Sequence, residues 1–207
     1  MMFIISGILM IGFYHLLLLA RRRQDIYNLF FGVFSTSIAL WILMNSDIAH
    51  LLSADTVLLR RRIDQISLMF VGPFFLMFLE SYSGRKFSRI GLVWTALCML
   101  IAITDTFAPF RIMIKALQIW MGSMIAGGAL IVFTILREVF RKNRDAYFMA
   151  GGVLLLIGGS VVDMLIDRGI LKGSFISQYS IILFDAGIAT VLANRYARVQ
   201  KQIEDLN

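Results

Sequence analysis

Long apolar stretches alternate with short polar connections along the whole chain. A helix needs about 20 mostly apolar residues to cross the roughly 30 Å hydrocarbon core of a bilayer. Seven stretches come close to this length, and we expect a transmembrane helix in each: Met2–Ala20, Ile26–Met44, Ile63–Tyr82, Ile90–Thr106, Ile112–Leu136, Ala146–Ile166 and Phe175–Ala193. The pattern predicts an all-α, polytopic membrane protein, built as a seven-transmembrane helix bundle.

Composition and charge agree with this interpretation and add an orientation. Of the 207 residues, 59% are hydrophobic and only 16% are charged, so lipid must solvate the apolar surplus. The connections after the first, third, fifth and seventh stretches hold more Lys and Arg than the others. The positive-inside rule therefore places the N-terminus outside and the C-terminus in the cytoplasm. The Arg60–Arg62 triplet counts against this orientation, because it falls in an outer connection.

The last predicted helix continues past the membrane. Apolar positions spaced by three and four residues form a signalling-helix stripe of Leu192, Tyr196, Val199, Ile203 and Leu206. This stripe predicts either a juxtamembrane helix on lipid headgroups or its own bundle, or the start of a parallel two-stranded linker. We favour the linker, which implies a homodimer. We therefore expect a transmembrane sensor or transducer domain at residues 1–193 and the start of a cytoplasmic signalling helix at 194–207.

Ionisable groups inside a span are costly and are functional candidates by default. Asp185 falls near the middle of the seventh stretch, and its candidate partners are the Ser35, Thr36 and Ser37 cluster and His15. A structural interhelical hydrogen bond and a switch or ligand role both remain open for it. Asp163 lies near the outer end of the sixth stretch, where pairing with Arg168 or Lys172 is possible. For His15 and Glu80 we expect snorkelling to the interface.

Small residues predict close helix packing at two places. Gly151, Gly152, Gly158 and Gly159 repeat at seven residues on the sixth stretch, and Gly127 lies in a similar group on the fifth. Such faces let another backbone approach closely, so we expect a tight interface there. Pro73, after Gly72, predicts a kink in the third helix.

Several kinds of chemistry find no support in the sequence. With two histidines and no H-E-x-x-H motif, we expect no metal site, and no G-x-S-x-G nucleophile motif occurs. The last stretch lacks the lysine that a retinal protein needs, and Asp163 and Asp185 differ too much in predicted depth for an aspartyl pair. The net charge of +7 sits between apolar runs, so we expect no nucleic-acid partner. We expect no cofactor and no catalytic domain in this chain.

Three segments carry a family resemblance. They are Gly12–Leu16 followed by Arg21–Asp25, then Asp163–Leu165 with Gly169, and then Leu192–Arg198. In their order and spacing the chain resembles the membrane domain of bacterial seven-transmembrane receptors with diverse intracellular signalling modules. The resemblance implies an exported sensor domain before the first span, and we suspect that the natural polypeptide begins before Met1. It also implies a cytoplasmic output such as a nucleotide cyclase, diguanylate cyclase, histidine kinase or phosphatase.

Two functional hypotheses follow. The first is a receptor domain in a bacterial cytoplasmic membrane that relays an extracytoplasmic or intramembrane stimulus through the seventh helix. The alternative is a small transporter or channel with Asp185 and Asp163 on a polar path, although the sequence shows no repeated half.

Overall fold

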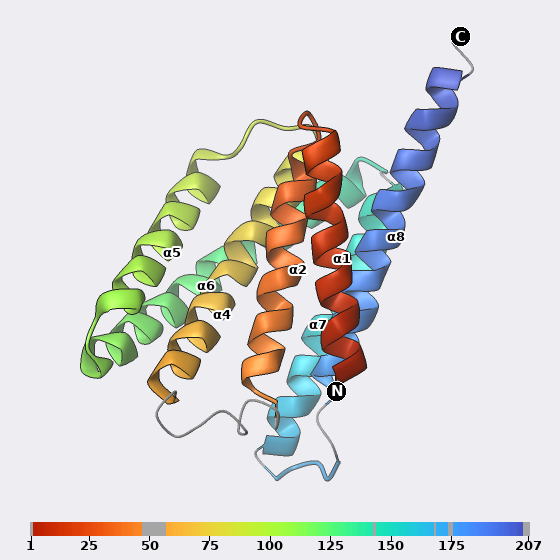
Figure 1. Ribbon diagram of the computed structural model, residues 1–207. Helices are drawn as coiled ribbons and strands as arrows, with labels where there is room; N and C mark the ends of the chain where they lie inside the picture. Colours follow the sequence, from red (N-terminus) through yellow and green to blue (C-terminus); the bar gives the residue numbers. More distant parts are fainter. Residues whose placement is uncertain (1, 47–56, 143, 168, 174–175, 205–207) are drawn as a thin grey trace. The chain divides into compact units, whose positions relative to one another are not determined.

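A computed structural model describes residues 2–46, 57–142, 144–167, 169–173 and 176–204. Within these residues the regular structure is helical (Figure 1). The helices are α1 (Met2–Arg21), α2 (Tyr27–Met44), α4 (Val57–Tyr82), α5 (Arg89–Phe107), α6 (Phe110–Phe140), α7 (Arg144–Asp167) and α8 (Ser177–Glu204). Each coincides with one predicted stretch, so the expectation of seven helices is confirmed.

The helix ends follow local chemistry. The hydroxyl of Ser88 caps α5 by accepting a hydrogen bond from the Gly91 amide at 3.0 Å. At the other end of α5, Pro109 follows the extended residue Ala108, and α6 begins at the next residue. Gly84 has a φ of +66°, which turns the chain after α4. These signals explain why α4 ends, and α5 begins and ends, within a few residues of the predicted boundaries.

Six of the described helices, α1, α2, α4, α5, α6 and α7, are long and apolar enough to cross a membrane. Helix α8 does not meet the same criterion. Its predicted apolar stretch carries Asp185, and the rest of the helix carries polar residues such as Asn194 and Arg195.

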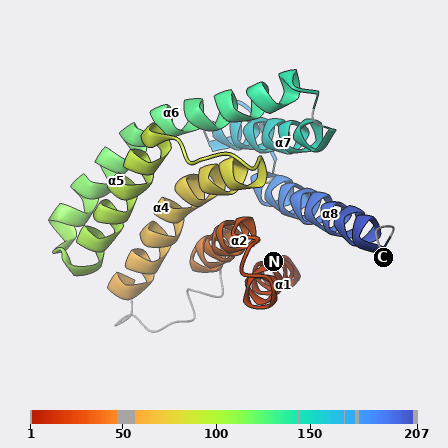
Figure 2. The ribbon, with the colours of Figure 1, turned by 90° about the horizontal axis from the view of Figure 1, so that it is seen from above.

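The described chain divides into two compact units, residues 1–134 and 135–207. In unit 1, α2 packs against both α1 and α4, and α4 packs against α5. An aromatic core joins α2 to α4, where Phe31 and Phe78 have ring centroids 5.3 Å apart and Phe34 and Phe75 are 5.1 Å apart. Helix α4 continues through Pro73, and Figure 2 shows it bending along its length, as the sequence predicted.

Unit 1 contains two close helix contacts that depend on glycine, which has no side chain to hold the helices apart. A Cβ on Gly12 of α1 would lie 3.1 Å from the Gly32 carbonyl oxygen of α2, so these two backbones touch. The indole ring of Trp94, on α5, fills the place of a Cβ on Gly127 of α6, and it also reaches Gly72 of α4. Trp94 is therefore a wedge that joins three helices.

Unit 2 is built around the antiparallel pair of α7 and α8. Gly169, with a φ of +70°, follows α7 and starts the turn toward α8. Figure 1 shows α8 as one uninterrupted helix along its described length. The two helices contact each other along their length.

Candidate functional site

The interface between α7 and α8 includes three specific contacts, one near each end of the pair and one in the middle. The middle contact is aromatic, because the ring of Phe184 occupies the place of a Cβ on Gly152. Asp185, the next residue, is fully buried, at 0% exposed. A carboxyl group in this place is costly unless its surroundings stabilise it, so it is sensitive to any change in how the helices pack.

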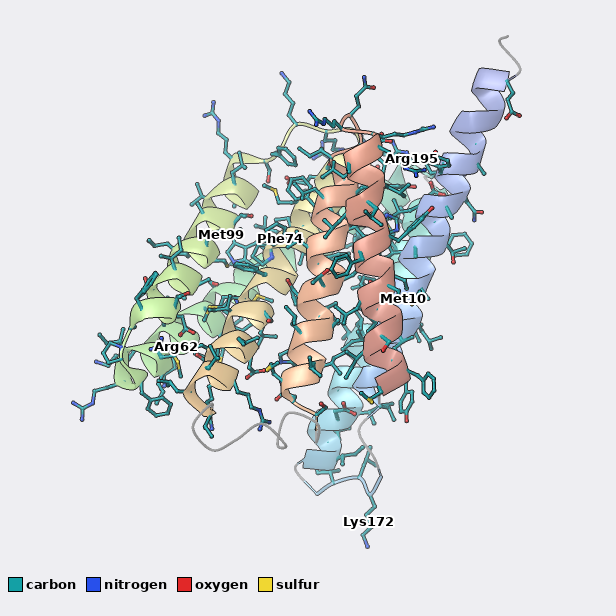
Figure 3. All side chains as sticks on the ribbon, in the orientation of Figure 1. Met10, Arg62, Phe74, Met99, Lys172 and Arg195 are labelled. Atoms are coloured by element: carbon teal, nitrogen blue, oxygen red, sulfur yellow. The ribbon has the colours of Figure 1, made fainter. Side chains whose placement is uncertain are left out.

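The second contact lies where α8 begins. The Asp163 carboxylate accepts a hydrogen bond from the Ile176 amide at 2.7 Å. This places a negative group at the positive end of the α8 dipole, as an N-terminal cap would. The predicted partner Arg168 lies outside the described residues, and Figure 3 shows Lys172 extending away from the helices.

The third contact lies at the opposite end of the pair. Arg198 of α8 and Asp145, in the first turn of α7, form an ion pair of 2.7 Å. The Arg198 side chain is 56% exposed and that of Asp145 is 16% exposed. Solvent screening keeps the contribution of such an exposed ion pair to stability below about 1 kcal/mol. The pair therefore does more to align the two helix ends than to stabilise the protein.

The other small residues predicted on α6 and α7 differ in their surroundings. A Cβ on Gly151 or Gly158 would have no neighbouring atom within 4 Å, whereas Gly159 is buried.

The signalling-helix stripe begins with Leu192, which is buried, and Tyr196, which is half-buried. Val199 and Ile203 fall within the bounds of α8, and Leu206 lies outside the described residues.

The predicted partners of Asp185 belong to unit 1, whereas Asp185 itself belongs to unit 2. Ser35 and Ser37 of α2 are buried, at 0% and 5% exposed. The Thr36 hydroxyl lies 2.7 Å from the place of a Cβ on Gly12, so it packs into the α1–α2 contact. A bond between Asp185 and this cluster stays a prediction.

His15 does not snorkel, so that expectation is wrong. It is buried, at 3% exposed, and its Nδ1 lies 2.9 Å from the Oδ1 of Asn28 on α2. Its ring also packs edge-on against Phe31, with centroids 4.7 Å apart. The side chain of Asn28 offers an interhelical partner inside the bundle, so His15 gains more from staying inside than from reaching the interface.

Glu80 does not snorkel either. It is 6% exposed and accepts a hydrogen bond from the Ser88 amide at 3.0 Å. The carboxylate therefore lies at the start of α5, where the helix dipole favours a negative charge. A sequence pattern does not show this contact, because it depends on how the turn between α4 and α5 folds.

The Arg60–Arg62 triplet has a structural explanation that the sequence did not show. The Nε of Arg60 donates to the Met44 carbonyl at 2.8 Å, at the end of α2. Arg62 donates to the carbonyls of Thr106 and Ala108 at 2.6 and 2.9 Å, at the end of α5. Cations are stabilised at helix C-termini, so these two arginines cap helices and do not act only as orientation signals.

Asp105 is a buried acid that sequence analysis missed. It lies in the last turn of α5, is 0% exposed, and interacts electrostatically with Arg62. Neither of its carboxylate oxygens has a hydrogen-bond partner among the described residues. A carboxylate inside the predicted stretch Ile90–Thr106 was the signal that could have identified it.

The described residues give little support for a metal site or for a reactive cysteine. They bring no three His, Cys, Asp or Glu side chains together in a way that could hold a metal ion. The one cysteine, Cys98, is buried beside Trp94 and Trp120 in the core that α4, α5 and α6 share.

The fold and its buried polar contacts define an integral membrane protein of packed helices. The family described as 7TM diverse intracellular signalling matches residues 1–195. The chain therefore belongs to this family of seven-transmembrane signalling receptors, and the resemblance read from the sequence is confirmed. No curated protein and no solved structure matches the chain.

Proposed function

We propose that this chain is the transmembrane transducer of a receptor in a bacterial cytoplasmic membrane. In this proposal the N-terminus lies outside, α8 is the seventh span, and its C-terminal part enters the cytoplasm. A stimulus from outside, or a ligand among the helices, changes the packing of the bundle. Helix α8 transmits that change to a cytoplasmic output module, in line with the family description.

The observation that carries the proposal is the continuity of α8. Its 28 residues, Ser177–Glu204, correspond to about 42 Å at 1.5 Å per residue. This exceeds the roughly 30 Å hydrocarbon core, so one helix can span the membrane and still project beyond it. A helix without a break transmits a rotation or a shift from one end to the other.

The three contacts with α7 define what α8 transmits. Asp163, Gly152 and Asp145 of α7 hold the start, the middle and the cytoplasmic part of α8. A movement of α7 therefore carries α8 with it, whereas a movement between them must break at least the Phe184–Gly152 contact. A stimulus switches the receptor only if it binds one packing better than the other.

We further propose that two copies pair through the signalling-helix stripe. Disulfide crosslinking in native membranes tests this pairing, in a Cys98→Ala background that removes the natural thiol. We expect Val199→Cys and Ile203→Cys to crosslink between chains. Lys201→Cys, between them on another face of the helix, is the matched control and should crosslink far less. Equal crosslinking at all three positions, or none at any, would contradict a paired stripe.

A further inference from the structure

A cleft opens in unit 1 where α2 ends and α4 begins. It has a volume of about 440 Å³ and is lined by Met44, Asn45, Val57, Arg60, Arg61 and Asp64. This volume lies in the range of small-molecule sites, which begins near 300 Å³. Four of the six lining side chains are charged or carry an amide, so polar groups decide what the cleft accepts.

Two of these polar groups build the wall of the cleft. Arg60 is held by its bond to the Met44 carbonyl, which closes the end of α2. Asn45 donates to the Trp41 carbonyl at 2.9 Å and also to one carboxylate oxygen of Asp64. The amide therefore fixes the position of Asp64 on the facing helix.

The other two groups present opposite charges to the cleft. Arg61 and Asp64 are three residues apart on α4, which places them on one face of the helix. They attract each other electrostatically, yet among the described residues Arg61 donates no hydrogen bond and Asp64 accepts only from Asn45. The cleft thus offers a guanidinium for an anion and, one turn away, a carboxylate for a cation.

We propose that this cleft binds the phosphoethanolamine group. A guanidinium fork matches the geometry of phosphate oxygens, and a primary ammonium has three hydrogens to donate to a carboxylate. The ligand then bridges Arg61 and Asp64, with its two carbons beside Met44 and Val57. In the orientation that we propose for the receptor, the cleft opens at the level of the outer headgroups. Phosphoethanolamine can reach it from a lipid or as a free solute.

The free source is tested with the full chain in phosphatidylcholine nanodiscs, which expose both faces of the protein. We expect saturable binding of O-phosphoethanolamine by calorimetry. Binding of phosphocholine, which has no ammonium hydrogen, and of inorganic phosphate should each be weaker by about tenfold or more. Arg61→Gln and Asp64→Asn should weaken binding of O-phosphoethanolamine by a similar factor. Arg111→Gln, an exposed arginine outside the cleft, is the matched control and should have no effect.

The lipid source is tested by native mass spectrometry of the same chain, purified from membranes with equal amounts of phosphatidylethanolamine and phosphatidylcholine. We expect the wild type and Arg111→Gln to retain phosphatidylethanolamine preferentially, and Arg61→Gln and Asp64→Asn to lose that preference. Selective binding in either experiment that depends on both Arg61 and Asp64 supports the proposal and identifies the source. Absence of selective binding in both, or selectivity unchanged in both variants, overturns it. Neither result depends on the orientation or on α8, so this inference and the proposed function fail separately.

Discussion

The two units hold their helices together in different ways. In unit 1, α4 lies between α2 and α5, and Trp94 joins three helices by filling the spaces that Gly72 and Gly127 leave. In unit 2, α8 packs along α7, with the Phe184 ring against Gly152 and a polar contact near each end. In unit 1, α2 and α4 each pack against two other helices, whereas in unit 2 α8 packs mainly against α7. We therefore expect unit 1 to be the more rigid of the two units and the α7–α8 pair of unit 2 to be the more adjustable.

The largest expected effect concerns the rigid unit. Arg62→Met removes two hydrogen bonds at the end of α5 and the positive charge beside buried Asp105. We expect a loss of about 3 kcal/mol in the free energy of unfolding, because a buried acid loses its compensating charge. Unfolding of the purified chain in detergent and denaturant measures it. Adding Asp105→Asn should recover part of the loss, and a double variant as unstable as the single one would show that the charge interaction is unimportant.

The next effect tests the Trp94 wedge. Gly127→Ala places a methyl group where the indole ring of Trp94 now lies. We expect it to lower the free energy of unfolding by about 2 kcal/mol, because the backbone or the side chains at an overpacked site must shift. Gly128→Ala, where the same methyl meets open space, is the neighbouring control and should leave the stability unchanged or slightly higher. Thermal unfolding midpoints of the two variants give the comparison. If both behave alike, Trp94 does not pack as described.

A smaller effect is expected in the adjustable unit. Gly152→Ala pushes the Phe184 ring away from α7 and should cost about 1 kcal/mol in stability. Its more informative consequence is a changed pattern of crosslinking along the signalling-helix stripe, because α8 must move to accommodate the methyl group. Gly151→Ala, at an open position, should change neither quantity. An unchanged pattern in Gly152→Ala would separate this contact from the position of α8.

The smallest effect concerns the exposed ion pair. Arg198→Glu places two acids together and should cost about 0.5 kcal/mol, and exchanging the charges in an Asp145→Arg, Arg198→Glu double variant should restore it. A double-mutant cycle of the unfolding free energy measures this coupling. A coupling indistinguishable from zero would show that the polar contact at this end does not help to position α8.

The sequence predicted the helices better than the contacts between them. Apolar length and local signals such as Ser88 and Pro109 locate helix ends, because they act within a few residues. The bond between His15 and Asn28, the capping role of Glu80 and the burial of Asp105 depend on which helix lies opposite. A single sequence does not contain that information. The sequence analysis predicted interfacial positions for His15 and Glu80 and did not single out Asp105, although all three are buried.

The orientation and the crossing of α8 are tested most directly by labelling introduced cysteines in the Cys98→Ala background with a membrane-impermeant thiol reagent. Lys172→Cys precedes α8, and Glu204→Cys lies at its described end. In intact spheroplasts the proposed topology predicts labelling at position 172 only, with position 204 labelled after the membrane is opened. Labelling of both positions from the same side would show that α8 does not cross the membrane and would contradict its role as the transducing helix.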